Sequence, residues 1–253
     1  MPTSLGIALI LAALSPRVAD DEKIEPPKRS EFVVIPLRVH VLTADDLPEV
    51  DCKLSDDDIR RIVGKVNGVW HAAGVHWGLE PIIREPAAKQ DRFRAIRDGL
   101  SGKMPPLGAF KILIPEATRA KDGLNVYYIH KFSVNGVYMD DRTAFVQETA
   151  SLRKVEGGID EPLPRVTAHE LGHALGLPHR QARTNLLASG TTGTSINAAE
   201  IANAREIARK TPGAMTMDDL SKAIDQEKDP VRAESLKRWR DEANSQPDPK
   251  GKS

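Results

Sequence analysis

The segment from His169 to His179 constrains the fold more than any other part of this 253-residue chain. It reads HELGHALGLPH, with two histidines four positions apart. On a helix, residues four apart leave the same face one turn apart, so both imidazoles would point the same way. Gly176 can take a positive φ and Pro178 cannot continue a helix, so we expect the helix to end there. The chain can then turn back and bring His179 towards the first two histidines.

This spacing is typical of a catalytic zinc site. Imidazole nitrogens of His169 and His173 can reach one tetrahedral zinc ion at about 2.0–2.1 Å, and His179 can supply the third ligand. Three protein ligands leave one position for water, as catalytic zinc sites do and closed structural sites do not. Glu170 follows the first ligand directly and projects beside the metal, where a carboxylate can act as general base on water.

The pattern His169–Glu170–x–x–His173–x–x–Gly176–x–x–His179 resembles that of the metzincin clan of zinc peptidases. Outside it, residues 66–70 (VNGVW), 73–75 (AGV) and 197–205 are similar to bacterial matrixin-like members. The resemblance covers about residues 32–210. It implies an α+β fold of the metzincin (zincin) type: a mixed twisted sheet, an active-site helix and a C-terminal helix.

The same resemblance implies a function. It predicts a zinc-dependent endopeptidase that hydrolyses peptide bonds with a metal-activated water, Zn²⁺ as cofactor and a peptide or protein as substrate. In the family, strands like those predicted at residues 124–132 and 143–149 flank the cleft, and their edge would bind an extended peptide by strand addition.

One departure from the family pattern lies at residues 185–190 (NLLASG), where Leu187 stands in place of the methionine expected beneath the zinc. Met215 and Met217 come too late in the chain to replace it. Leu and Met have similar volumes, so metal binding is still expected. No tyrosine follows Tyr138, which excludes the metzincins that use a tyrosine from this turn as an additional ligand.

Two other functions remain open. The chain could be a catalytically weak or inactive peptide-binding module on the same scaffold, a reading that Leu187 favours and the retained Glu170 disfavours. It could instead hydrolyse a non-peptide amide, which only substrate profiling would distinguish from proteolysis. The sequence leaves the oligomeric state open.

The N-terminal segment predicts export. Residues 5–14 (LGIALILAAL) are too short to span a bilayer but suit a signal peptide over residues 1–19. The alternative is an apolar helix packed on the domain, because no Lys or Arg precedes the run. Residues 20–30 are charged, contain two prolines and read as a linker. We therefore expect a secreted or periplasmic protein, and no later segment is apolar enough to cross a membrane.

Residues 31–210 read as one catalytic domain of strands and helices. Apolar, β-branched runs predict strands at residues 32–43, 75–83, 110–115, 124–132 and 143–149. Helical spacing and capping residues predict helices starting after Ser55, within residues 86–104, after Asp160 and at Asn197, and residues 133–141 read as a loop or hairpin. Residues 211–253 read as a charged tail, with one or two polar helices at 218–240 and disorder at 245–253.

The composition makes nucleic acid an unlikely partner. Lys and Arg number 36, as do Asp and Glu, and aromatic residues make up 4%. Such a chain has neither the excess positive charge nor the stacking surface of a nucleic-acid binder. Arg92, Arg94 and Arg97 are therefore interpreted as a solvated helix face.

The single cysteine, Cys52, excludes an intrachain disulfide and any zinc site built from cysteines. Some metzincins are held inactive by a thiolate at the zinc, and Cys52 could play that part. A partly buried loop thiol is the favoured interpretation. Four histidines outside the motif are expected to be structural or on the surface, because three ligands are already supplied: His40, His71, His76 and His130.

Overall fold

The computed structural model describes residues 27–101 and 103–245. The predicted signal peptide and residues 20–26 of the predicted linker lie outside the described residues. Within them, one sheet has the strand order β2–β1–β4–β6–β5, and β3 and β7 also pair with β1. The strands are β1 (Val33–Thr43), β2 (Val75–Leu79), β3 (Ile83–Pro86), β4 (Leu124–Ile129), β5 (Gly136–Tyr138), β6 (Thr143–Gln147) and β7 (Met215–Thr216).

The sheet is mixed and mostly parallel. Strands β2, β3 and β4 run parallel to β1, and β6 runs parallel to β4. Strand β5 is antiparallel to β6, and β7 is antiparallel to β1. The prediction of a mixed sheet accompanied by helices is thus confirmed at this level.

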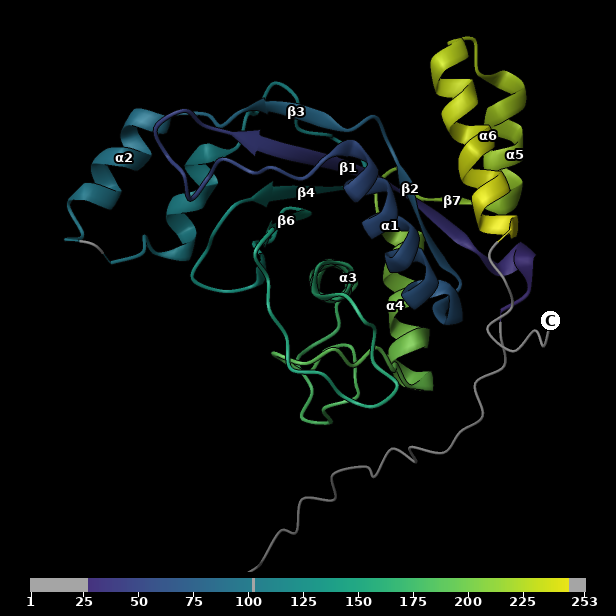
Figure 1. Ribbon diagram of the computed structural model, residues 1–253. Helices are drawn as coiled ribbons and strands as arrows, with labels where there is room; N and C mark the ends of the chain where they lie inside the picture. The colour runs from purple at the N-terminus through teal and green to yellow at the C-terminus, as the bar shows by residue number, and fades with distance from the viewer. Residues whose placement is uncertain (1–26, 102, 246–253) are drawn as a thin grey trace, which may run out of the picture.

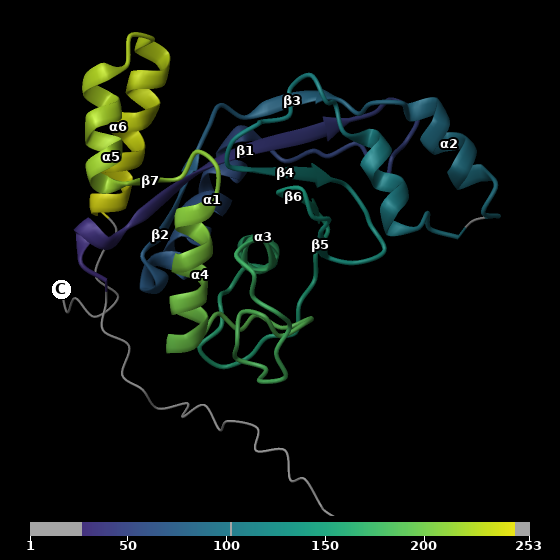
Figure 2. The ribbon, with the colours of Figure 1, turned by 180° about the vertical axis from the view of Figure 1, so that it is seen from behind.

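Helices cover both faces of the sheet. Helices α1, α3 and α4 lie on one side, and the hairpin of α5 and α6 stands at the other side near β7 (Figures 1 and 2). The α-helices are α1 (Asp56–Trp70), α2 (Gln90–Asp98), α3 (Pro162–Ala174), α4 (Ala198–Lys210), α5 (Met217–Gln226) and α6 (Pro230–Ser245). The 3₁₀ helices are η1 (Arg29–Glu31), η2 (His71–Ala73) and η3 (Leu107–Leu113).

The side chains of strand β1 alternate between the two faces of the sheet. Successive side chains of a strand point to opposite faces. Ile35 and Leu37 belong to the core beneath α1, α3 and α4. Val34 packs with α5 and α6 instead, and Leu42 packs with α2 and η3. The strand is therefore apolar almost throughout, because helices cover it on both sides.

The predicted N-terminal ends of the helices at Ser55 and Asn197 are confirmed. Ser55 caps α1 by accepting a hydrogen bond from the Asp58 N–H, and the Asp58 side chain accepts one from the Ser55 N–H in return. Asn197 and Glu200 make the same reciprocal pair at α4. Such capping boxes satisfy donors that the first helical turn leaves without partners.

Several predicted elements differ from the structure. The predicted strand at 110–115 is wrong: this segment belongs to η3, whose buried Phe110 and Leu113 are three residues apart, one turn of a 3₁₀ helix. The predicted strand at 75–83 divides into β2 and β3, which pair with different parts of β1. The predicted helix at 86–104 is shorter, confined to α2. Glu161, and not Asp160, is the N-cap residue of α3.

The predicted charged tail contributes to the fold. Its residues 215–216 form β7, and α5 and α6 follow. Trp239 of α6 packs directly over β2, since a Cβ on Gly78 would lie 2.5 Å from its ring. Residues 246–253, predicted to be disordered, lie outside the described residues.

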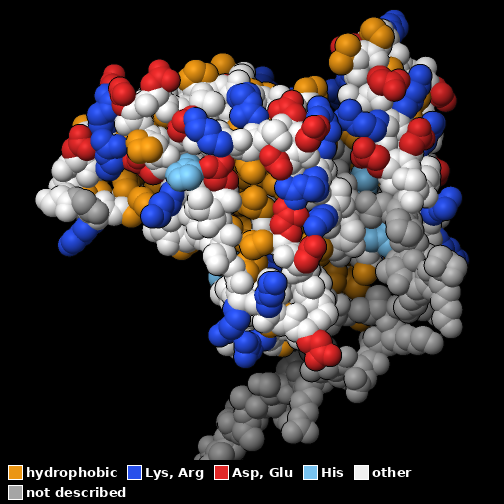
Figure 3. Space-filling model, viewed as in Figure 1, with side chains coloured by type: hydrophobic (Ala, Val, Ile, Leu, Met, Phe, Trp, Pro, Cys, Tyr) orange, Lys and Arg blue, Asp and Glu red, His pale blue; other side chains and the backbone are white. Residues whose placement is uncertain are grey.

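The face of the molecule seen in Figure 3 carries acidic and basic side chains interspersed with each other. This arrangement agrees with the equal numbers of the two kinds in the sequence. Within residues 27–101 and 103–245, we find no helix that has both the length and the apolar character needed to cross a membrane.

Candidate metal centre

The C-terminal end of α3 brings three histidines together. His169 and His173 lie on α3, which ends at Ala174 and has Leu175 as its C-cap residue. Gly176 follows with φ of +75°, and the N–H groups of Gly176 and Leu177 donate to the carbonyls of His173 and Gly172. This hydrogen-bond pattern is the Schellman termination that glycine favours. The chain therefore reverses as the sequence predicts, and His179 returns to the helix.

The three imidazoles meet through their Nε2 atoms. The Nε2 of His173 lies 3.1 Å from that of His169 and 3.1 Å from that of His179, and the remaining pair is 3.3 Å apart. Nitrogens bound to one tetrahedral zinc ion at 2.0–2.1 Å lie about 3.3–3.4 Å from each other. These three histidines lie close enough to hold a metal ion.

Backbone carbonyls orient two of these rings. The Nδ1 of His169 lies 2.8 Å from the Leu186 oxygen, and the Nδ1 of His173 lies 2.8 Å from the Leu177 oxygen. A carbonyl only accepts, so each Nδ1 carries the proton and each Nε2 presents its lone pair. Carbonyl partners of this kind fix the tautomer that binds a metal.

Burial favours the neutral form of His169 and His173. His169 is buried and His173 is half-buried, whereas His179 is exposed. Burial lowers the pKa of His169 to about 3, and the nearby Arg165 guanidinium lowers it further despite the hydrogen bond to Leu186. Burial also lowers the pKa of His173. The neutral imidazole is the form that binds metal, so both groups are ready ligands near neutral pH.

Glu170 lies beside the three histidines and is itself buried, with 5% of its surface exposed. Burial raises the pKa of its carboxyl to about 8, although the Tyr138 N–H donates a hydrogen bond to it. Strand β5 packs closely here, since a Cβ on Gly136 would lie 2.9 Å from the Glu170 Oε1. A carboxyl with this raised pKa, next to a metal-binding group, is suited to accept and release a proton.

A cavity of about 600 Å³ contains the histidines and Glu170. Its wall includes β5, the last strand in the sheet order, so the edge of β5 away from β6 is not paired within the sheet. The resemblance implied an edge formed by residues 124–132 and 143–149. That expectation is wrong for both strands, because β4 lies between β1 and β6, and β6 lies between β4 and β5. The edge at the cavity is formed by the hairpin residues 136–138.

The turn beneath the site contains Leu187, which is fully buried. The Cδ1 of Leu187 lies 3.2 Å from where a Cβ on Gly172 would be, so this side chain packs under α3 next to His173. The Leu187 N–H donates to the Asn185 side chain at 2.7 Å. Leucine thus occupies the apolar floor where the resemblance expects methionine.

The sequence did not reveal the carboxylate that holds this region together. Glu200, predicted only as a helix-capping residue, is 1% exposed. It accepts hydrogen bonds from the Arg180 Nε at 2.5 Å and the Asn185 side chain at 2.9 Å. Through Glu200, the loop that carries His179 and the turn that carries Leu187 are fixed to the start of α4.

Arg165 is a second residue that the sequence analysis missed. It lies on α3 one turn before His169, is 2% exposed and lines the cavity. The helical spacing of Arg165, His169 and His173 was the available signal. An arginine on the helix face of the two ligands indicates a residue of the site, because buried cations are rare without a reason.

Two of the other histidines make hydrogen bonds away from the metal centre. His40 is buried between Glu85, 2.7 Å from its Nδ1, and Asn125, 3.2 Å from its Nε2. His130 pairs with Glu148. Neither histidine lines the cavity around the three ligands.

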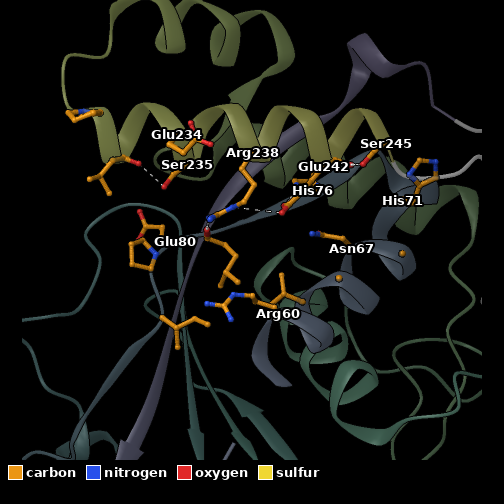
Figure 4. Close-up of a pocket in the computed structure, with 18 residues that line it drawn as sticks. Arg60, Asn67, His71, His76, Glu80, Glu234, Ser235, Arg238, Glu242 and Ser245 are labelled. Atoms are coloured by element: carbon orange, nitrogen blue, oxygen red, sulfur yellow. Dashed lines mark hydrogen bonds and ion pairs between the residues drawn. The ribbon is translucent and has the colours of Figure 1, made fainter. Parts of the chain in front are cut away.

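A larger cavity, of about 1120 Å³, lies between α1, β2 and α6 (Figure 4). His71 and His76 line it, and the Nε2 of His76 lies 3.5 Å from the Glu242 carboxylate. Arg238 reaches across from α6 and donates to the Leu79 oxygen at 2.6 Å. No group of three potential metal ligands converges there among the described residues, so we assign the chemistry to the smaller cavity.

Cys52 is 1% exposed, and its thiol donates to the Glu148 carboxylate at 3.2 Å. Burial raises the pKa of this thiol far above its usual value. Cys52 does not line the metal cavity, and a protonated thiol is a poor metal ligand. These features agree with the buried loop thiol and not with a latch.

No protein-family model matches the chain, and no curated protein sequence is significantly similar to it.

Proposed function

We propose that this chain is a zinc-dependent endopeptidase with a metzincin-like domain. The observation that carries the proposal is the convergence of the Nε2 atoms of His169, His173 and His179 beside the buried carboxyl of Glu170. The motif of the sequence and the reversal of the chain at Gly176 support it, because this reversal is what the third ligand requires.

The donor set favours zinc among the common metal ions. The three ligands are neutral imidazoles, and no carboxylate belongs to the ligand group among the described residues. Calcium and magnesium prefer oxygen ligands, whereas imidazole suits zinc. Three ligands at these separations leave room for a fourth on the cavity side.

Glu170 carries the proton transfers in the proposed mechanism. A bound zinc ion would supply Lewis acidity at the scissile carbonyl and at the attacking water. The Glu170 carboxylate takes a proton from that water as its oxygen bonds to the carbonyl carbon. It then gives the proton to the leaving amine as the carbon–nitrogen bond breaks. The substrate backbone would lie along the open edge of β5, adding a strand to the sheet.

A peptide-binding module without hydrolysis is the second candidate, and Leu187 is the observation that favours it. The retained Glu170 disfavours this function, because a module that only binds peptides has no need of a buried base. Export remains a proposal that rests on residues 5–14 of the sequence, outside the described residues.

Two substitutions separate the roles of base and ligand. Glu170→Gln should keep the zinc and the fold and lower hydrolysis of a mixed peptide library by about 10²–10⁴-fold, because it removes a general base. His173→Ala should lower both zinc content and hydrolysis, because it removes a ligand. Metal analysis and peptide turnover measure both effects.

Glu206→Gln is the matched control, since Glu206 is an exposed glutamate of α4 that pairs with the exposed Lys210. It should leave zinc content and hydrolysis unchanged. Hydrolysis by Glu170→Gln at the natural rate would contradict the proposed mechanism. A natural protein that binds zinc and peptides but cleaves none of the library would support the binding module instead.

A further inference from the structure

The guanidinium of Arg165 is buried in the wall of the metal cavity without a carboxylate partner. Its Nε donates to the Gly193 oxygen at 3.2 Å, and its Nη2 donates to the Asn185 oxygen at 3.4 Å and to the Ala188 oxygen. These partners are uncharged carbonyls. Within the described residues, no carboxylate lies within ion-pair distance of Arg165. A buried cation in such surroundings is costly unless a negative charge comes near it.

The N–H groups of the Arg165 Nη1 have no acceptor among the described residues. Its neighbour is the Nδ1 of His169, at 3.2 Å. That nitrogen cannot accept, because its proton is donated to the Leu186 oxygen so that Nε2 faces the metal position. The Nη1 group therefore has N–H donors without an acceptor in the part of the chain that the structure describes, in a side chain that lines the cavity. A guanidinium keeps its charge at neutral pH, and although burial disfavours the charged form, the nearby Glu170 carboxyl favours it.

The lining of the cavity is poor in negative charge. Glu170 is the one carboxylate in it, and the proposed mechanism uses it as the base. Residues 171–199, which include the rest of α3 and the loop below it, contain no Asp or Glu. Outside the lining the exposed charges are of both signs: Arg153 and Lys154 follow the cavity residue Leu152, and Asp140 and Asp141 follow the cavity residue Tyr138. Arg165 is the one Lys or Arg in the lining, so it is the cation that an anionic group entering the cavity would meet.

We propose that Arg165 makes this centre selective for peptides with an Asp or Glu side chain next to the scissile bond. The carboxylate of that side chain would accept hydrogen bonds from Nη1 and compensate the buried charge. This inference rests on the proposed peptidase function. The apolar residues of the same wall, Val134, Leu152 and Val166, would contact the methylene groups of the side chain.

Peptides that differ at one position test the inference on the natural protein loaded with zinc. Each peptide carries Glu, Gln, Leu or Lys immediately before or after the bond that is cleaved. We expect kcat/KM for Glu to exceed that for Gln at least tenfold at one of these positions, which is about 1.4 kcal/mol. The peptide with Lys at that position should have the lowest kcat/KM. Equal rates for Glu, Gln and Leu at both positions would overturn the inference.

A binding measurement separates this inference from the peptidase function itself. Zinc-loaded Glu170→Gln protein should bind the Glu peptide at least tenfold more tightly than the Gln peptide in calorimetric titration. If the natural protein cleaves no peptide but this preference is present, the peptidase function fails and the acidic selectivity holds. Equal affinities for the Glu and Gln peptides, like equal rates of cleavage, would overturn the selectivity.

Variants of Arg165 link the preference to this residue. Arg165→Gln should bring kcat/KM for the Glu peptide down to that for the Gln peptide, and Arg165→Lys should retain part of the difference because it keeps the charge. Arg165 also holds the loop of residues 185–193. A purely structural loss would lower kcat/KM for the Glu peptide and for the Gln peptide by the same factor. Zinc content and thermal unfolding verify that each variant is folded. An unchanged Glu-to-Gln ratio in folded Arg165→Gln would contradict the proposal.

Discussion

Helices α1 and α3 pack on the same face of the sheet, but the charged residues of α1 are exposed or partly exposed and those of α3 are buried. Helix α1 keeps its charges outside, as in the exposed pair of Arg60 and Asp57 at 2.8 Å. Its buried polar side chain is Asn67, which both donates to and accepts from the Trp77 backbone. A helix built in this way gains stability from its apolar face and loses little on the other face.

Helix α3 is buried from Leu163 to Gly172 and carries polar groups inside. Thr167 is satisfied by the Tyr128 hydroxyl at 2.7 Å, but Arg165 and Glu170 bring ionisable groups into the interior. Buried charges without close ion pairs cost stability. This difference indicates that α3 buries polar residues because it borders the cavity, whereas α1 buries mainly apolar residues because it packs on the core.

The largest effect we expect on stability concerns Glu170 in metal-free protein. Its pKa is raised from 4.5 to about 8, so folding favours the protonated form. This contribution is fully present below pH 4.5 and is lost as the pH rises towards 8. Glu170→Gln stays neutral, so its free energy of unfolding should exceed that of the natural protein by roughly 2–5 kcal/mol at pH 9.

Urea denaturation of the chelated proteins at pH 5 and pH 9 measures this difference. The increase in the free energy of unfolding caused by Glu170→Gln should be much smaller at pH 5. His169, whose neutral form is favoured, loses stability as the pH falls, but it does so equally in both proteins. An identical difference at the two pH values would show that α3 carries no buried-charge penalty at Glu170.

An intermediate effect is expected at Leu187. If the floor beneath α3 needs only apolar volume, Leu187→Met should change the free energy of unfolding by less than about 1.5 kcal/mol. The rate of peptide hydrolysis should change by less than about tenfold, or 1.4 kcal/mol of barrier. Zinc content and turnover of the two forms are compared side by side. An inert natural protein that gains hydrolysis from this substitution would replace the peptidase by the binding module.

The smallest effect should come from α1. Arg60→Ala removes an exposed pair, and surface substitutions of this kind usually change stability by no more than about 0.5 kcal/mol. Thermal unfolding and peptide hydrolysis should match those of the natural protein. A loss above about 1.5 kcal/mol would mean that α1, like α3, depends on its polar residues.

Local signals explain where sequence and structure agree. The capping boxes at Ser55 and Asn197 and the reversal at Gly176 each depend on residues a few positions apart. Where prediction failed, the deciding contact was distant. Residues 75–83 looked like one strand, but β1 offers partners at two separate places along its length. Residues 110–115 were apolar enough for a strand, and such short runs cannot be told from a buried helix by periodicity.

The sequence by itself determined the ligand group, because His169, His173 and His179 and the glycine that joins them fall within eleven consecutive residues. Only the tertiary structure decided what surrounds it. Sheet order placed β5 over Glu170, and the fold brought the carbonyls of residues 185–193 to Arg165. The reason is physical: helical spacing fixes neighbours within one or two turns, whereas an alternating strand pattern fixes only which face a residue takes and not which strand lies beside it.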